Sequence, residues 1–235
     1  MSKTTIMLKL SGASLNLKDN NNIISFDVLN ELANQIKELS KHFNIAIVIG
    51  GGNIWRGAIA EKVNMPREQA DYMGMLATII NSIALESALK NLNINAKVFS
   101  KIDVEKICDN YYIRNVKEYL QNEGVVILAA GTGMPYFSTD TSAAIGAVEI
   151  NAKYILMGKN NVDGVYSEDP MLNPHAVFYD RLSFDDVISK NLKVMDASAI
   201  AICKEYKIKI IVFKINEPNS IVNALNKKTK FTIID

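Results

Sequence analysis

The chain alternates short apolar runs with longer stretches of helical periodicity along nearly its whole length. The short runs are almost continuously apolar, which is typical of strands buried on both faces of a sheet. Strands separated by helices usually pair in parallel, and the helices then cover both faces. We therefore predict an α/β fold, an αβα sandwich with a mainly parallel central sheet, formed as a single domain by residues 1–235.

The same periodicities predict the individual elements. Predicted strands are Thr5–Leu10, Ile45–Ile49, Ala96–Ser100, Val125–Ala130, Lys153–Gly158 and Ile208–Phe213, and the terminal run Lys230–Asp235 carries no assignment. Predicted helices are Ser25–Phe43 with Ser25 as its N-cap, about Glu68–Leu92, a segment after Asp140, Ala197–Tyr206, and a last helix from near Pro218. Residues 160–166 predict a turn with short flanking strands.

The long predicted helix contains the run YMGMLATIINSIALESAL, from Tyr72 to Leu89, which is apolar around much of its circumference. A helix that is apolar on all sides has to be buried on all sides. Two interpretations stay open for it. It is either a core helix within one subunit or a helix shared with a neighbouring subunit.

Composition argues against several classes of protein. The formal net charge is +1, so the chain lacks the basic balance of a general nucleic-acid-binding protein. Its two cysteines form no CxxC pair, and only two histidines are present, which argues against a zinc site or a serine-hydrolase triad. No apolar run reaches the roughly 18 residues that span a membrane, and the N-terminus lacks a signal-peptide pattern. We expect a soluble, cytoplasmic protein with no nucleic-acid or membrane partner.

Small, backbone-rich loops follow the predicted strands, at the edge where an open parallel sheet binds its ligands. These loops are Ser11–Gly12, Gly50–Asn53 with Arg56 close behind, Gly131–Asp140, and Gly158–Asn161. Glycine lets backbone amides approach a ligand closely, and helix N-termini favour anions. One such loop alone is more simply a tight turn, but several at one edge favour a phosphate site.

The usual nucleotide-binding motifs are absent. The chain contains no GxxxxGK[ST] sequence, and Tyr136 stands where a GxGxxG motif needs its third glycine. The protein-kinase set of HRD, DFG and APE is missing as well. Any phosphate chemistry here therefore uses another scaffold.

Three charged residues, Lys9, Asp140 and Lys159, lie where phosphoryl transfer would use them, and Asp71 is ambiguous. Lys9 interrupts an apolar strand, which is costly unless its ammonium group is paired or binds an anion, although it could also point outward. Asp140 opens a predicted helix and could serve only as its N-cap. Lys159 could reach a phosphate or only solvent, and Asp71 could simply be an acidic residue favoured at the start of its helix.

The loops show no obvious base with a positioned partner. Phosphoryl transfer to an alcohol usually needs a carboxylate or histidine that accepts the proton. A phosphate or carboxylate acceptor is already ionised near neutral pH and needs cations, amides and alignment instead. This pattern favours an acidic acceptor.

Longer motifs carry a resemblance to a known family. They are LKLSG (Leu8–Gly12), VIGGGNIWRG (Val48–Gly57), DYMGMLATIIN (Asp71–Asn81), AGTGMPYFSTD (Ala130–Asp140), VDGVYSEDP (Val162–Pro170) and LKVMD (Leu192–Asp196). In this order, over nearly the whole chain, they resemble the bacterial-type uridylate (UMP) kinases of the amino-acid kinase superfamily. The resemblance implies an amino-acid kinase-like αβα sandwich. It also implies transfer of the γ-phosphoryl group of Mg-ATP to UMP, giving UDP and ADP in pyrimidine nucleotide (CTP/UTP) biosynthesis.

The resemblance implies roles for individual residues. Implied catalytic residues are Lys9, Asp140 and Lys159, with Asp140 as the organiser of the phosphate-binding lysine and the metal. Implied ATP-binding residues are Lys9, Leu10, Ser11, Gly12, Gly52, Arg56, Asn160, Tyr166 and Asp169. Implied UMP-binding residues are Gly51, Asp71, Thr132, Gly133, Met134, Pro135, Tyr136, Phe137, Ser138 and Thr139. No metal site built from protein ligands is implied, so Mg²⁺ is expected to enter with ATP.

The family also implies inhibition by UTP and a homo-hexamer built as a trimer of dimers. One region departs from its pattern. After the KLSG motif many members have Glu and a Gly-rich segment linked to activation by GTP, whereas here Ala13 follows and residues 13–25 contain no glycine. The resemblance therefore carries no expectation that GTP activates this chain.

Two alternatives to a UMP kinase remain. The first is a kinase for a carboxylate or carbamate such as acetylglutamate, whose relatives lack the GTGMPYFSTD loop. The second is a non-catalytic sensor of uridine nucleotides, against which the presence of both Lys9 and Asp140 argues.

Overall fold

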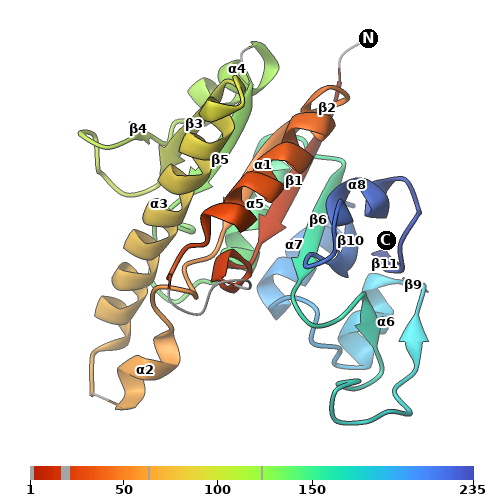
Figure 1. Cartoon of the computed structure of the whole chain (residues 1–235). Coiled ribbons are helices and arrows are strands. Elements are labelled where there is room, and N and C mark those ends of the chain that lie inside the picture. The colour runs from red at the N-terminus through yellow and green to blue at the C-terminus, as the bar shows by residue number, and fades with distance from the viewer. Residues whose placement is uncertain (1–2, 17–21, 63, 123) are drawn as a thin grey trace.

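A nine-stranded sheet lies between two layers of helices (Figure 1). The computed structural model describes residues 3–16, 22–62, 64–122 and 124–235. The strands run across the sheet in the order β4 (Asp109–Asn110), β3 (Ala96–Ser100), β5 (Val125–Ala129), β2 (Phe43–Ile49), β1 (Thr4–Leu10), β6 (Tyr154–Lys159), β10 (Lys209–Lys214), β11 (Phe231–Ile234) and β9 (Arg181–Leu182). Every pairing in it is parallel except that of β10 with β11. The predicted αβα sandwich with a mainly parallel sheet is confirmed.

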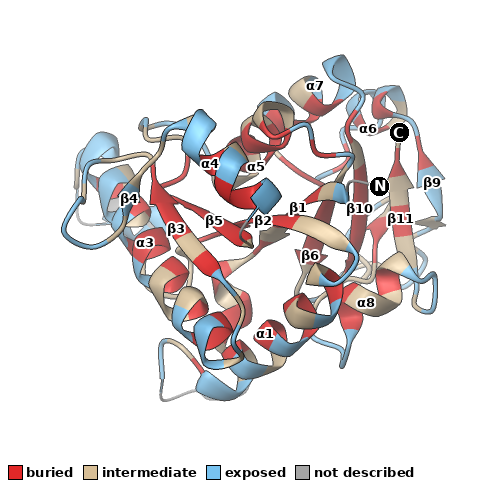
Figure 2. Cartoon of the chain, turned by 90° about the horizontal axis from the view of Figure 1, so that it is seen from above, coloured by how far each residue is buried: buried red, intermediate tan, exposed pale blue. Residues whose placement is uncertain are grey.

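Each face of the sheet has its own helices and its own apolar core (Figure 2). One layer contains α1 (Phe26–Ser40), α3 (Arg67–Asn91) and α8 (Ser220–Leu225). The other contains α4 (Ile113–Asn122), α5 (Thr139–Glu149), α6 (Phe184–Ser189) and α7 (Ala197–Glu205). The short elements are the 3₁₀ helix η1 (Gly12–Asn16), α2 (Gly57–Lys62), and a separate ribbon of β7 (Val165–Tyr166) with β8 (Phe178–Tyr179).

The central strand β1 divides its side chains between the two cores, as the pleat of a strand requires. Ile6 and Leu8 belong to the core beneath α1 and α3, whereas Met7 belongs to the core on the α5 side. Lys9 has the same parity as Met7, so the one charged side chain of this strand lies on the α5 side of the sheet.

The sequence placed most strands and the long helices within a residue or two, but two assignments need correction. The predicted helix Ser25–Phe43 ends at Ser40, because Phe43 already pairs with Thr4 as the first residue of β2. Its predicted N-cap is correct, since the Ser25 side chain accepts a hydrogen bond from the Val28 amide. Helices α2, α4 and α6 were not predicted, although Val116, Tyr119 and Leu120 form a buried stripe on α4.

The long helix α3 is buried on one side only. It is long and apolar enough, by length and composition, to cross a membrane, and half of its apolar window is buried inside the molecule. Its other side exposes large apolar residues, among them Leu76 at 49% and Ile80 at 50% of their surface. A single copy of the chain therefore leaves one apolar stripe of this helix uncovered.

Candidate active site

The loops that follow β1, β2, β5 and β6 meet at the carboxyl edge of the sheet. The turn after β1 packs so closely on the Gly50–Asn53 loop that a Cβ on Gly12 would lie 2.3 Å from the Gly50 carbonyl oxygen. Only glycine fits at that position. Asn81, fully buried in α3, donates to the Gly50 oxygen at 2.7 Å and fixes the second loop from behind.

The predicted catalytic residues Lys9 and Asp140 form an ion pair. Lys9 Nζ lies 2.5 Å from Asp140 Oδ1, and the two side chains are only 13% and 18% exposed. Asp140 is not the N-cap of α5. Ser138 takes that role and accepts from the Asp140 and Thr141 amides, so the alternative that Asp140 serves only as a cap is wrong. The carboxylate is free to orient the lysine that interrupts β1.

Lys159, the third predicted catalytic residue, ends β6 beside β1. Its Nζ donates to the Val194 carbonyl oxygen at 2.5 Å. Burial lowers its pKa below the ordinary lysine value; the charge of Asp140 opposes this shift and the charge of Lys9 adds to it. Lys159 therefore lies within electrostatic reach of the Lys9–Asp140 pair, so the three residues form one charged cluster.

A further carboxylate that the sequence did not single out supports this cluster. Asp196, the last residue of the LKVMD motif, caps α7 and accepts hydrogen bonds from the hydroxyl groups of Ser138, the N-cap of α5, and Thr141 in its first turn. Burial acts to raise the pKa of Asp196, but these hydrogen bonds and one from the Ala199 amide outweigh it and hold the pKa below its usual value. The N-terminus of α5 is therefore tied to α7.

A pocket of about 140 Å³ opens on one side of the charged cluster. Predicted UMP-binding residues that line it are Gly51, Asp71, Thr132, Phe137 and Thr139, and predicted ATP-side Gly52 lines it too. Met134 and Tyr136, predicted for the same role, are 54% and 67% exposed and do not line it, and neither do Gly133, Pro135 and Ser138. The sequence did not single out Trp55, Gly74 or Thr78, which complete its wall. We call this the acceptor pocket.

The loop over the acceptor pocket is held in an unusual backbone conformation. Ala130, Gly131, Gly133 and Tyr136 all have positive φ, between 58° and 79°. The Tyr136 amide donates to Asp71 at 2.7 Å, and Arg67 donates to both oxygens of the same carboxylate at 3.0 Å. The first turn of α3 therefore holds the tip of this loop in place.

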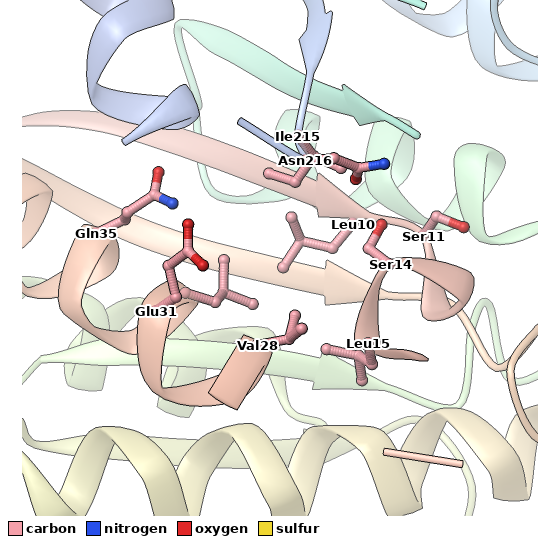
Figure 3. A pocket seen from close by; sticks show the side chains of 10 residues that line it. Leu10, Ser11, Ser14, Leu15, Val28, Glu31, Gln35, Ile215 and Asn216 are labelled. Carbon is pink, nitrogen blue, oxygen red and sulfur yellow. The ribbon is translucent and has the colours of Figure 1, made fainter. Parts of the chain in front are cut away.

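A second pocket, of about 560 Å³, opens beside Lys159. Tyr166 and Asp169 are the predicted ATP-binding residues that line it, and the predicted catalytic residue Lys159 lines it as well, together with Gly164 and Val194. We call this the donor pocket. Leu10 and Ser11 line a separate hollow behind the first turn (Figure 3), and exposed Arg56 donates to the Gly52 oxygen at 3.0 Å. Asn160 lines none of these pockets.

Within the described residues, no group of three or more His, Cys, Asp and Glu side chains is close enough to hold a metal ion. The charged cluster contains a single carboxylate, that of Asp140. This arrangement fits an ion that is bound mainly by substrate phosphates and water, because Mg²⁺ usually takes one or two carboxylates beside them.

Comparisons with known proteins agree with the geometry. The sequence pattern of the "Amino acid kinase family" matches residues 4–214. The uridylate kinase of Malacoplasma penetrans is 54% identical over 234 residues, which cover all of this chain and 73% of the relative. The uridylate kinase of Ureaplasma parvum is 50% identical over 234 residues, covering 100% and 99% of the two chains.

Solved structures show the same likeness. The crystal structure of the UMP kinase from Ureaplasma parvum superposes with a TM-score of 0.97 at 50% identity and covers 100% of both chains. The UMP kinase from Bacillus anthracis superposes with a TM-score of 0.93 at 32% identity, covering 100% of this chain and 97% of the other.

Proposed function

Because this chain belongs to the amino acid kinase family, and within it to the uridylate kinases, we propose that it transfers the γ-phosphoryl group of ATP to UMP. The products are UDP and ADP, and the reaction belongs to the synthesis of the pyrimidine nucleotides UTP and CTP. The observation that carries the proposal is the placement of the Lys9–Asp140–Lys159 cluster. It lies at the carboxyl edge of one sheet, with Lys159 on the wall of the donor pocket and Thr139, next to Asp140, on that of the acceptor pocket.

We propose that catalysis rests on charge and alignment. The ammonium groups of Lys9 and Lys159 stabilise the negative charge on the transferred phosphoryl group, and the N-terminal amides of α5 add to this field. Asp140 orients Lys9 through the 2.5 Å ion pair. The UMP phosphate is already ionised near neutral pH, so the attack needs no general base from the chain.

We propose that Mg²⁺ enters with ATP and that Asp140 is the carboxylate nearest to it. When bound, the ion neutralises charge on the β- and γ-phosphates. Asp140 would help to hold the ion, by accepting a hydrogen bond from its hydration water, while one carboxylate oxygen stays against Lys9.

On the acceptor side, we propose that Asp71 accepts hydrogen bonds from the ribose hydroxyls. The amides of the Gly50–Gly52 loop and the hydroxyl of Thr139 receive the phosphate of UMP, since Gly51, Gly52 and Thr139 line the acceptor pocket and Gly50 lies beside Thr139. A uridine triphosphate shares the base and ribose of UMP, so we expect UTP to inhibit by occupying the same pocket.

The exposed stripe of α3 supports an oligomer. Tyr72, Met73, Leu76 and Ile80 are each at least 38% exposed on one helix. We propose that the stripe forms the contact of a dimer and that three such dimers form a hexamer, each chain contributing one amino-acid kinase-like domain in the cytoplasm. Sedimentation of Leu76→Glu and Ile80→Glu should show smaller species than the unsubstituted chain, and an unchanged assembly would contradict this contact.

The direct test of the function is ADP release, coupled to a detecting enzyme, with a panel of phosphate and carboxylate acceptors. We expect turnover with UMP, much less with CMP, and none with acetylglutamate. Equal rates with CMP and UMP would contradict the proposed specificity. Activity on acetylglutamate alone would support the carboxylate-kinase alternative, and UMP binding without ADP release would support a sensor.

A further inference from the structure

Asn160 stands in the sequence between two residues that line the donor pocket, but it does not line the pocket itself. Its neighbours Lys159 and Asn161 both line that pocket, whereas Asn160 does not. Its side-chain Oδ1 accepts a hydrogen bond from the Ser14 hydroxyl at 2.6 Å. Its main-chain oxygen accepts from the Asn216 side-chain amide at 2.7 Å. Both acceptor groups of Asn160 are therefore engaged with residues far away in the sequence.

The two donors belong to elements that are themselves fixed. Ser14 lies in η1, only 6% exposed, and its own amide donates to the Ser11 oxygen at 3.0 Å. Asn216 follows β10, where the Ile215 amide donates to the Lys159 oxygen at 2.8 Å. Figure 3 shows Ser14 and Asn216 on the wall of the same hollow, which the apolar side chains of Leu10 and Leu15 also line.

We propose that Ser14 and Asn216 are positioning residues for ATP, which act by holding Asn160 and, through it, the wall of the donor pocket against the first phosphate-binding turn. The inference rests on the proposed function in that it takes the donor pocket to be the ATP site. Ser14 lies in the stretch after Gly12 that departs from the family's sequence pattern. This chain therefore uses the altered stretch to connect the turn after β1 with the loop after β6.

The two hydrogen bonds act on ATP through preorganisation. Residues 160–164 connect β6 to β7, and three of the five line the donor pocket. Without the bonds to Asn160 this segment samples more conformations, and binding has to order them at a cost in conformational entropy. A net hydrogen bond corresponds to an affinity change of about three- to ten-fold.

The test compares Ser14→Ala with the matched control Ser40→Ala. The Ser40 hydroxyl also donates to a carbonyl oxygen, that of Lys37, but at the far end of α1. ATP affinity is measured by titration calorimetry without acceptor, and UMP affinity by the fluorescence of Trp55, the single tryptophan, on the wall of the acceptor pocket. We expect ATP to bind Ser14→Ala about three- to ten-fold more weakly, with UMP affinity and kcat at saturating ATP unchanged.

Asn216→Ala should weaken ATP binding in the same direction, and the double variant should weaken it further. Ser40→Ala should match the unsubstituted chain. Unchanged ATP affinity in Ser14→Ala would overturn the inference, and so would an equal loss for UMP, which would indicate general loosening. These titrations need no turnover. An unsubstituted chain that binds ATP yet fails to phosphorylate UMP would therefore overturn the proposed function, while the role of Ser14 and Asn216 in ATP binding could still be tested.

Discussion

The two sides of the candidate active site are held in different ways. On the acceptor side the backbone itself sets the shape, because the loop after β5 contains four residues with positive φ. On the donor side the wall is held by side chains, with Ser14 and Asn216 on Asn160, and Lys230 and Asp163 around the Tyr166 hydroxyl. A backbone-built pocket tolerates few substitutions, whereas each side-chain contact contributes a modest share.

The difference fits what each pocket has to recognise. Uracil and cytosine differ at one edge of the ring, so an acceptor pocket that separates them needs fixed hydrogen-bonding groups. The donor pocket has to hold a large polyphosphate in line, and many separate contacts can share that task. Substitutions on the acceptor side should therefore impair the recognition of UMP, whereas substitutions on the donor side should weaken the binding of ATP.

Lys9→Ala should have the largest effect, because it removes a charge at the junction of the two sides. We expect kcat to fall by about 10²- to 10³-fold, the usual effect of losing a charge-stabilising donor. UMP binding, followed by Trp55 fluorescence, should change little. The control is Lys3→Ala, which removes a lysine just before the other end of β1. A kcat within a few fold of normal would remove the role given to Lys9.

Gly133→Ala should have the next largest effect, and it should impair only the acceptor side of the site. Gly133 has φ of +79°, and a Cβ there would lie 2.7 Å from the Lys101 carbonyl oxygen. We expect UMP affinity to fall by about 30-fold, from backbone strain and steric clash together. Gly131→Ala is the matched control, since φ is +58° but nothing lies within 4 Å of the added Cβ. Equal losses in the two variants would show that the clash is unimportant.

Asp71→Ala should have a smaller effect on the same side. It removes the acceptor of the Tyr136 amide and the expected partner of the ribose, while the exposed Arg67 needs no replacement partner. We expect the KM for UMP to rise about ten-fold with the KM for ATP unchanged. Glu68→Gln, which changes an exposed carboxylate in the same helical turn, should leave both values unchanged. A rise in the KM for ATP would show that the two sides are coupled.

The protonation of Lys159 should have the smallest effect on kcat/KM at neutral pH and the largest effect in alkaline solution. Burial lowers its pKa, so its ammonium group loses the proton at a lower pH than an ordinary lysine, whose pKa is about 10.4. The charged form binds phosphate, and kcat/KM for ATP should therefore fall as pH rises through the lowered pKa. Lys159→Arg should move this decline to higher pH, because guanidinium stays protonated. An identical alkaline profile in both proteins would assign the decline to another group.

The sequence predicted the sheet well because continuous apolar runs between helices have few other solutions. It predicted Lys9 and Asp140 but left the purpose of Asp140 open, because Ser138 and Asp140 both suit an N-cap and only the backbone decides between them. Asn81 was missed, since a polar side chain in an apolar segment acquires its partner only when the chain folds. Likewise, nothing local to Asn160 indicates a bond to Ser14, 146 residues away.

Successive side chains of β1 point to opposite faces of the sheet, and this alternation limits how the strand can change in length. Insertion or deletion of one residue between Met7 and Lys9 would turn the ammonium group toward α1, across the sheet from Asp140. Removal of two residues would return the Lys9 side chain to the face of Asp140, but it would shift the ammonium group along the sheet. Related chains should therefore keep the length of this strand even where its aliphatic residues are freely exchanged.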